Sequence, residues 1–550
     1  MKGYTMSMQD TQRRNFLKTL LAGSAFTALN WAAFPTGAGA ATEPNEYDAI
    51  IIGSGLGGLS CGAAFARQGF KVLVVEQHNR PGGYATSFKR PGGFEFDVSL
   101  HSTTVGDRDG LHNLIPGFPE ITDVEYIAHP DLYRVIYPDY DITVAQKNPD
   151  AYIAQLKTLF PAEAKGIDGI FEDMRGLSSD IAKYSDPNNK ISMMEVPVKL
   201  PYLFKCFSKT WGQMVDTRIS DPKLKAIISS QWGYYGLPPS KLSSFYYALP
   251  AIGYLEGGGY YPRGRSQTIS NALVKFIEDH NGQVMLKTKA EKILVNEGAA
   301  YGVATDKGEF HAKVVVSNAN APDTINKMLD DGGYLTAYKS KMEGYEVSLS
   351  SFQIFLGLNK DIVGASGITS SEIFVETGYD MEAGYQEALA GNVENGGYGL
   401  TLYDNVFPGY SPKGKNTLNI MTLQGYDHWE PYAADYFKGE KEAYRAEKQR
   451  MADIMIANVE KTLLPGLADA IEVIEIGTPL TNLRYTGNPK GAIYGWDQTM
   501  NNSGNRRVGH STPVRNLYLS GAWSKPGHGY SAVLGSGLEC FGEIMSNWKS

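Results

Sequence analysis

Apolar residues form two short runs near the N-terminal end of the chain, with a glycine turn and a helical segment between them. Asp48 to Ile52 and Lys71 to Val75 are typical of buried parallel strands. Small and apolar residues from Gly57 to Gln68 predict a helix, which Gly69 ends. The pattern therefore predicts a strand, turn, helix and second strand within Tyr47 to Glu76.

The turn between the first strand and the helix carries the spacing G-x-G-x-x-G. Gly53 permits the tight turn, Gly55 lets a pyrophosphate approach the backbone, and Gly58 lets the helix pack closely on the sheet. The free N–H groups at the start of the helix favour phosphate. Glu76 follows 23 residues after Gly53, where a carboxylate accepts the ribose hydroxyls. The segment predicts a dinucleotide site.

A second strand, glycine turn and helix follow near the C-terminal end. Leu517 to Ser520 predict a buried strand, Gly521 opens a turn, and Ser531 to Met545 predict a helix after Gly527-His528-Gly529. The two glycine motifs lie more than 400 residues apart, so one domain must be built from distant segments. A chain of 550 residues exceeds the size of a single core, and about two domains are expected.

Five blocks in this order resemble the phytoene desaturase, carotenoid isomerase and retinol saturase group of flavoproteins. After the first motif, HNRPGGYATSF and GGFEFDVSLH are similar to the start of the FAD site in that group. The similarity continues in YYPRGRSQTISNAL, in AEKILV with VVVSNANAPDT, in GTPLTNLRYTGNPKGAIYGW and in NLYLSGAWSKPGHGYSAVLGSG. The fourth block is most similar to the retinol saturase pattern.

This resemblance implies an α/β fold with a discontinuous, Rossmann-like FAD domain of the glutathione reductase type and a mixed α+β substrate domain. We expect the FAD domain at residues 46–120, 250–330 and 480–550, and the substrate domain at 121–249 and 331–479. The resemblance and the glycine motifs together imply contacts with FAD from Gly53, Ser54, Gly55, Gly57, Gly58, Glu76, Gln77, Gly83, Ala290, Gly521, Ala522, Tyr530 and Ser531.

Three polar side chains near the expected flavin ring have two interpretations each. His101 ends the F-D-V-S-L-H segment and is either a structural residue or a catalytic residue that contacts substrate or ring. Lys525 and His528 belong either to a solvated loop or to the groups that tune the redox reaction. The chain departs from the family at Ser99, where glycine is usual, and at Ala522, where aspartate is common.

Aromatic residues dominate the expected substrate domain. Residues 231–262 are dense in tyrosine and glycine, and Tyr246, Tyr247 and Tyr254 are the candidates for a pocket wall. The same residues suit an ordinary core. Residues 192–215 combine apolar and aromatic residues with three lysines, which also suits peripheral contact with a membrane surface.

The N-terminal segment predicts export by the twin-arginine route. Arg13 and Arg14 precede an apolar stretch that is short for a membrane span, and Ala38-Gly39-Ala40 fits a cleavage site within a signal peptide at residues 1–40. An uncleaved membrane anchor is the alternative. Export predicts a periplasmic protein that is loaded with FAD before translocation, with a quinone, a cytochrome or oxygen as electron partner.

Charge and cysteines exclude other classes. The first forty residues carry a net charge of +3, so removing them changes the net charge from −8 to −11, which argues against nucleic acid as a partner. Three cysteines show no metal or haem spacing, and Cys61 and Cys540 fall in predicted helices where a buried thiol is expected. No metal site is expected, and no basic cluster indicates an anionic substrate.

Together these observations predict an FAD-dependent oxidoreductase that acts on carbon–carbon double bonds of a hydrophobic substrate, of which polyenes are the example that the family suggests. Desaturation, saturation and isomerisation remain open. A flavin amine oxidase is the first alternative, and a nonenzymatic electron-transfer protein is the second.

Replacing Arg13 and Arg14 by lysine should leave folded precursor in the cytoplasm, because the export receptor reads the arginine pair and not positive charge alone. Cell fractionation with mass measurement of the mature chain checks this. Normal amounts of cleaved periplasmic protein from the double variant would refute the export signal.

Overall fold

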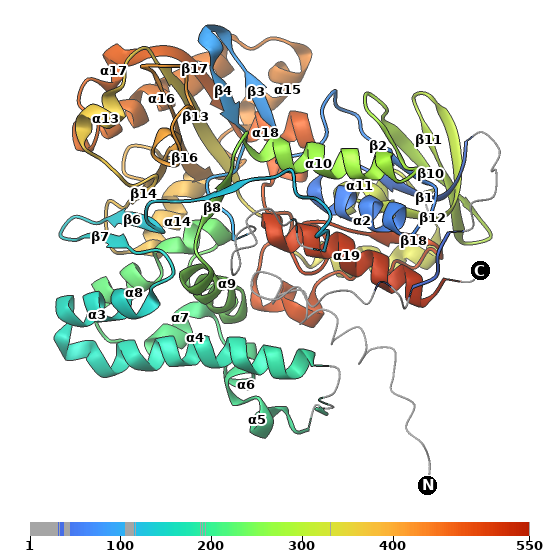
Figure 1. Ribbon diagram of the computed structural model, residues 1–550, viewed down its shortest axis with the longest axis horizontal. Helices are drawn as coiled ribbons and strands as arrows, with labels where there is room; N and C mark the ends of the chain where they lie inside the picture. Colours follow the sequence, from blue (N-terminus) through green and yellow to red (C-terminus); the bar gives the residue numbers. More distant parts are fainter. Residues whose placement is uncertain are drawn as a thin grey trace.

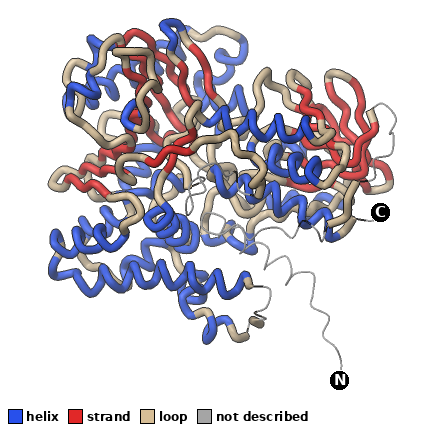
Figure 2. The backbone as a smooth tube through the Cα atoms, viewed as in Figure 1, coloured by secondary structure: helices blue, strands red, loops and turns tan. Residues whose placement is uncertain are grey.

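The computed structural model describes residues 31, 34–37, 45–104, 115, 117–186, 189, 191–192, 194–330 and 332–548. Two seven-stranded sheets lie side by side in the upper half of the molecule, and a layer of helices lies below one of them (Figures 1 and 2). The twin arginines and Ala38-Gly39-Ala40 lie outside the described residues. No helix of the described residues is long and apolar enough to cross a membrane.

The first sheet has the order β10-β11-β12-β1-β2-β9, with β18 paired to β12. β1 pairs in parallel with both β2 and β12, so that Ile50 lies between Leu73 and Val315. β10, β11 and β12 form an antiparallel extension. The strands are β1 (Glu46–Ile52), β2 (Val72–Val75), β9 (Gln283–Met285), β10 (Ala290–Asn296), β11 (Ala299–Thr305), β12 (Gly308–Ser317) and β18 (Leu517–Leu519).

Both faces of this sheet are buried, as its continuous apolar strands predict. Ala49 and Ile51 of β1 face α2 (Leu56–Arg67), α10 (Ser266–Asp279) and α19 (Tyr530–Ser546). Ile50 and Ile52 face the other side, toward α11 (Ala321–Asn326) and α12 (Thr336–Glu343). Figure 1 shows α2, α10 and α19 together on one face.

The second sheet is mostly antiparallel, with the order β17-β13-β16-β15-β14-β6-β7. Helices α15 to α17 cover one face and bury Trp429 completely. The strands are β6 (Tyr133–Ile136), β7 (Asp141–Val144), β13 (Ser350–Leu358), β14 (Glu372–Val375), β15 (Tyr398–Leu402), β16 (Asn416–Gln424) and β17 (Ile471–Gly477). The associated helices are α13 (Ile362–Ser366), α14 (Met381–Ala390), α15 (Glu430–Lys438), α16 (Glu442–Thr462), α17 (Leu467–Ala470) and α18 (Pro479–Thr486).

A helical region packs under β6 and β7 and shares one apolar cluster with them. It contains α3 (Pro149–Leu159), α4 (Ala164–Ser185), α5 (Val196–Lys199), α6 (Pro201–Phe207), α7 (Trp211–Asp216), α8 (Pro222–Ile228) and α9 (Ser244–Gly257). Two small antiparallel ladders, β3 (Ser87–Lys89) with β4 (Glu95–Asp97) and β5 (Tyr126–Ala128) with β8 (Tyr260–Pro262), connect the regions.

The structure moves two of the expected domain boundaries. The boundary expected at 249/250 falls inside α9, which packs as one helix with α4 and α7 and ends at Gly257. The boundary expected at 330/331 falls before α12, whose Met342 belongs to the apolar cluster of the first sheet. Sequence motifs set both expected boundaries. A motif does not reveal the hydrophobic core against which a neighbouring helix packs.

Glycines let the helices around the first motif pack backbone to backbone. A Cβ on Gly58 would lie 2.1 Å from the carbonyl oxygen of Gly53, and a Cβ on Gly537 of α19 would lie 2.3 Å from that of Gly57. Cys61 and Cys540 lie on α2 and α19 and are completely buried, as expected. Close contact between α2 and α19 therefore holds the two distant motifs together.

Replacing Gly537 by alanine should lower the free energy of unfolding by about 1–3 kcal/mol, the usual cost of forcing atoms into a packed interior. Gly542 is the matched control, because it lies on the same helix and a Cβ there meets nothing within 4 Å. Gly542→Ala should be neutral or slightly stabilising, since alanine favours helix. Denaturant unfolding measures both, and equal effects would contradict the proposed close contact.

Candidate functional site

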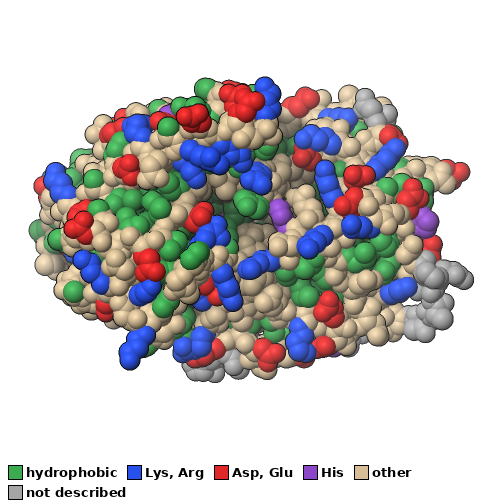
Figure 3. Space-filling model, turned by 90° about the horizontal axis from the view of Figure 1, so that it is seen from above, with side chains coloured by type: hydrophobic (Ala, Val, Ile, Leu, Met, Phe, Trp, Pro, Cys, Tyr) green, Lys and Arg blue, Asp and Glu red, His purple; other side chains and the backbone are tan. Residues whose placement is uncertain are grey.

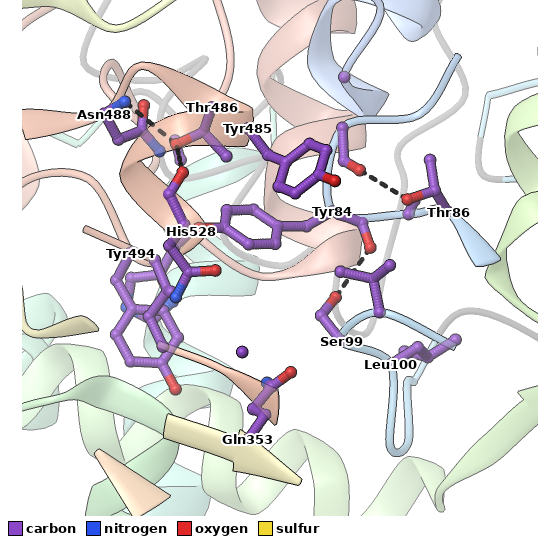
Figure 4. Close-up of a pocket in the computed structure, with 18 of the residues that line it drawn as sticks. Tyr84, Thr86, Ser99, Leu100, Gln353, Tyr485, Thr486, Asn488, Tyr494 and His528 are labelled. Atoms are coloured by element: carbon purple, nitrogen blue, oxygen red, sulfur yellow. Dashed lines mark hydrogen bonds between the residues drawn. The ribbon is translucent and has the colours of Figure 1, made fainter. Parts of the chain in front are cut away.

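One continuous cavity of about 1400 Å³ runs from the glycine turn after β1 to the cavity-facing side of β14, β15 and β16. The first sheet and its loops line one end, and the second sheet with α9 lines the other. Figure 4 shows part of its wall, where Tyr84, Tyr485, Tyr494 and His528 surround an open space. Single ligands occupy pockets of roughly 300–1,000 Å³, so this cavity has room for two molecules.

The turn between β1 and α2 is shaped to receive an anion. Gly53 has φ +91°, a conformation that glycine adopts without strain. Gly55 caps α2 without any side-chain hydrogen bond, so the first N–H groups of the helix remain available to a phosphate. Gly53, Gly55 and Gly57 line the cavity, and these contacts fit a pyrophosphate.

Asn318, which follows β12, completes this turn and was not recognised as a site residue in the sequence. A Cβ on Gly55, Gly57 or Gly521 would lie between 2.3 and 2.7 Å from its side-chain amide atoms. Asn318 lines the cavity and its Nδ2 donates to the carbonyl oxygen of Gly53 at 3.5 Å. The V-V-S-N-A block of the family resemblance was the available signal.

Glu76 lines the cavity but is already partly bound by the protein. Its Oε2 accepts hydrogen bonds from the backbone N and the Oγ of Ser54, at 2.8 and 2.7 Å, and its Oε1 accepts from the backbone N of His78 at 2.9 Å. These bonds fix the carboxylate at the end of β2, where a ribose would lie. Ser54 is completely buried and holds Glu76 from behind.

The other expected cofactor residues divide into those that line the cavity and those that support it. Ser54 and Gly58 do not line it, which corrects the expectation that they contact the cofactor directly: one anchors Glu76 and the other packs against Gly53. The residues that do line it are Gly53, Gly55, Gly57, Glu76, Gln77, Gly83, Ala290, Gly521, Ala522, Tyr530 and Ser531.

The loop before α19 is held by a buried arginine that sequence reasoning missed. Arg507 is 1% exposed, and it donates to the carbonyl oxygen of Ala522 at 2.6 Å and to that of Ser524 at 2.9 Å. Burial lowers the pKa of Arg507 from its ordinary value. Its charge lies beside the loop that faces the expected flavin ring, where it favours negative charge.

His528 lines the cavity, whereas Lys525 does not. The imidazole of His528 packs against Tyr494 with ring centroids 4.3 Å apart, and its Nε2 has no hydrogen-bond partner among the described residues. Burial, with a smaller effect from Arg507, lowers its pKa to about 3. A solvated loop is therefore the wrong interpretation for His528, because the loop folds inward over α19.

His101 reaches from the first domain to the second sheet. Its Nδ1 lies 2.6 Å from Oγ1 of Thr401, and its Nε2 lies 3.3 Å from Sδ of Met421. Burial lowers its pKa to about 4, so the ring is neutral at pH 7. Ser99, at the unusual position two residues earlier, donates to the carbonyl oxygen of Tyr84 at 3.0 Å. Figure 4 shows this bond.

Two of the three tyrosines expected in the pocket line the cavity. Tyr246 and Tyr254 do, and their hydroxyl groups have no partner within the described residues. Tyr247 does not, which corrects the expectation. It stacks on Trp211 at 4.3 Å and donates to the carbonyl oxygen of Ile228 at 2.7 Å, because one residue along α9 turns the side chain toward α7.

Sequence reasoning also missed the cavity-facing residues of β14. Glu372, Phe374 and Glu376 alternate along this segment and all line the cavity. The side chains of a strand alternate between its two faces, and the sequence S-S-E-I-F-V-E-T shows that alternation. Burial raises the pKa of Glu372 and of Glu376 to about 8.

The fold assembles a basic group that the sequence did not show as a cluster. Lysine and arginine side chains gather around a hollow on the face seen in Figure 3. Burial lowers the pKa of Lys448, and Arg445 and Lys441 lower it further. The basic residues lining the cavity come from five segments: Arg80, Lys89, Arg90, Lys289, Lys441, Arg445, Lys448 and Arg484. This part of the cavity is therefore suited to an anion. The sequence predicted no basic cluster, and the structure corrects that expectation.

Metal chemistry has no ligand set within the part of the chain that the structure describes, since no group of three or more His, Cys, Asp or Glu side chains is placed to hold an ion.

Comparison with known proteins gives the following relatives. Residues 51–112 match the model of the NAD(P)-binding Rossmann-like domain. The chain is 27% identical over 542 residues to all-trans-retinol 13,14-reductase of Danio rerio, covering 92% of this chain and 87% of that protein. It is 28% identical over 521 residues to prolycopene isomerase 1 of an Oncidium hybrid cultivar, covering 93% and 86%.

Solved structures show the same fold at low sequence identity. A putrescine oxidase has a TM-score of 0.60 and 14% identity, covering 91% of this chain and 99% of that one. An oxidoreductase from Methanosarcina mazei has a TM-score of 0.58 and 16% identity, covering 90% and 99%.

Replacing Gly55 by valine should abolish dinucleotide binding, because the side chain would meet Asn318 and block the approach of the pyrophosphate to the backbone. Gly298→Ala in the same domain is the control, since a Cβ there meets nothing within 4 Å. Because Gly298 has a φ of +73°, we expect this control to lose a little stability and to keep its cofactor. The absorbance of released cofactor measures occupancy. A folded Gly55→Val protein with full occupancy would disprove the cradle.

Proposed function

We propose that the chain is an FAD-dependent oxidoreductase of the phytoene desaturase, carotenoid isomerase and retinol saturase type, and that it adds, removes or rearranges hydrogen at carbon–carbon double bonds of a long apolar substrate of the polyene class. The enzyme class and fold predicted from the sequence are confirmed. The substrate class follows the names of two groups of relatives that align over most of the chain.

The observation that carries the proposal is the continuity of the cavity. Its first part has the glycine turn, Glu76 and Ala290, which suit FAD. Its second part is an elongated chamber between α9 and the second sheet, whose apolar and aromatic lining suits a polyene: Leu249, Tyr254, Phe374, Leu400, Met421 and Leu423. A carrier of electrons needs no such chamber, which disfavours the nonenzymatic alternative.

FAD, when bound, supplies hydride transfer, and the residues of this chain orient and enclose the reactants. The helix start at Tyr530 places N–H groups and the positive end of its dipole toward the expected ring. Arg507 holds the preceding loop, and Tyr494 and His528 form one wall. The buried side chains of the chamber exclude water from the reacting carbons.

The amine oxidase alternative has support from the fold alone, because the solved amine oxidases are 13–14% identical to this chain. An amine cation would need an ionised carboxylate beside it. Glu372 and Glu376 are the cavity-lining carboxyls of β14 and its end, and burial raises the pKa of both to about 8, which favours the neutral form at pH 7. Neutral acids suit an uncharged substrate.

We also propose export and contact with a membrane surface. Arg13 and Arg14 support export.

The support for membrane contact is an apolar surface on α5, α6 and the residues before them. Met194 and Val198 are 92% and 83% exposed there, and Phe204 and Phe207 are also exposed. Flotation with lipid vesicles, compared with a Val198→Glu, Phe204→Glu variant, measures this contact. A quinone, a cytochrome or oxygen is the proposed electron partner.

The purified protein should bind FAD, and polyenes or enones should change the redox state of that flavin under anaerobic conditions. Amines should not. The absorbance of the flavin during addition of each compound measures this, starting from both the oxidised and the reduced protein. Rapid reduction by amines, without a response to polyenes or enones, would support the amine oxidase alternative instead.

A glutamate at Leu249 should reduce turnover at least tenfold and leave FAD content unchanged, because an unpaired charge in an apolar chamber costs several kcal/mol, about 2–7 for a polar group. Leu249 lies on the cavity-facing side of α9 and is 4% exposed. Tyr301→Glu, at an exposed position of β11, is the surface control. Parallel loss of FAD and turnover at Leu249 would mean that this helix supports the fold and not the substrate.

A further inference from the structure

The inner chamber contains a carboxyl group with one oxygen left open. Glu372 begins β14 and is 2% exposed. Its Oε2 accepts a hydrogen bond from the hydroxyl of Tyr234 at 3.0 Å, whereas its Oε1 has no hydrogen-bond partner in the described part of the chain. The residue lines the cavity, and Oε1 is buried within this part of the wall.

Neighbouring groups hold this carboxyl in place. Glu372 pairs across the ladder with Thr401 of β15, whose hydroxyl opposes the increase in the pKa of the carboxyl and lies 2.6 Å from Nδ1 of His101. Tyr234, which donates to Oε2, and Thr401, which faces the carboxyl across the ladder, are positioning residues.

Within the described part of the chain, no cation compensates a charge on this carboxyl. The titratable groups that face it are Tyr234 and Tyr254 from the helical region, Asp131 before β6, Tyr403 after β15, and His101 through Thr401. Burial raises the pKa of Glu372 to about 8 and Asp131 adds to the increase. The group is consequently protonated at pH 7, and a proton on Oε1 has no acceptor among the residues that the structure describes.

We propose that Glu372 is the acid that delivers a proton from Oε1 to a substrate carbon in the chamber. This inference rests on the proposed function. Adding hydrogen across a double bond requires a hydride at one carbon, supplied with the reduced flavin, and a proton at the other. The O–H bond of Glu372 breaks, a C–H bond forms, and the residue is left as a carboxylate that solvent protonates before the next turnover.

The same geometry assigns a direction to the reaction. A carboxyl that meets its substrate in the protonated form is an acid, and desaturation would instead need a base at this position. The structure therefore favours saturation among the three reactions considered. It also distinguishes Glu372 from Glu376, which is half-buried and lies beyond the end of β14.

Glu372→Gln is the central variant, because glutamine keeps the shape and donates a hydrogen bond but transfers no proton. With polyene and enone substrates in D₂O, the wild-type product should carry a solvent-derived deuterium at the carbon that Glu372 protonates, and the variant should lose at least 100-fold in the rate of incorporation at that carbon, the lower range of general acid effects. The wild-type rate should fall tenfold per pH unit above about 8, and this decrease should be absent from the residual rate of the variant.

Asp131→Asn is the matched control. Asp131 is also a buried carboxyl with one unpartnered oxygen, and its Oδ2 accepts from Ser370 at 2.6 Å, but it does not line the cavity. This variant should retain deuterium incorporation and show a pH limit shifted slightly downward, since it removes a negative charge near Glu372. A general effect of losing a buried carboxyl would appear in both variants.

An infrared difference between wild-type protein and Glu372→Gln provides a readout without turnover. It should show the carbonyl stretch of a protonated carboxyl at neutral pH that disappears as the pH rises through about 8, whereas the signal of Glu376 cancels. An ionised carboxylate at pH 7 in that difference would overturn the inference, as would wild-type incorporation by Glu372→Gln. If the wild type turned over no polyene or enone, the proposed function itself would fail, and the inference with it.

Discussion

The backbone contact between α2, α19 and the turn after β1 is the constraint on which the rest of the structure depends. Gly57, Gly58 and Gly537 let these segments approach to distances that a Cβ would prevent, and Asn318 fills the remaining space beside Gly521. The contact brings together segments more than 400 residues apart. It also leaves the start of α2 without a side-chain cap, so that packing and cofactor binding use the same glycines.

The inserted segments are placed by this framework. Because β1, β12 and β18 are parallel neighbours in one sheet, the residues between them leave at the carboxyl end of one strand and return at the amino end of the next. The second sheet and the helical region are built from those insertions and enclose the far part of the cavity. Asp97 fixes one crossing point: it is completely buried and accepts hydrogen bonds from Tyr261 and Ser266, which lie on the return segment.

The sequence predicted the first domain well because its signals are local. Gly53, Gly55 and Glu76 are recognised by their fixed spacing, and the continuous apolar runs of β1 and β2 indicate burial on both faces. The far end of the cavity was not predictable in this way. Tyr246 and Tyr247 are adjacent tyrosines with opposite surroundings, and only the orientation of α9 decides which one faces the chamber. The basic residues Arg80, Lys448 and Arg484 converge from separate segments that no local pattern connects.

Glu372 shows why buried polar groups carry information that the apolar pattern lacks. A carboxyl among aromatic side chains weakens the core unless something compensates for its desolvation, and here Tyr234 donates to one oxygen while the other has no partner among the described residues. Asp97 has both oxygens bonded, and Asp131 has one unpartnered oxygen but does not line the cavity. Glu372 combines an unpartnered oxygen with a place in the cavity wall, a combination that neither of these two buried acids has.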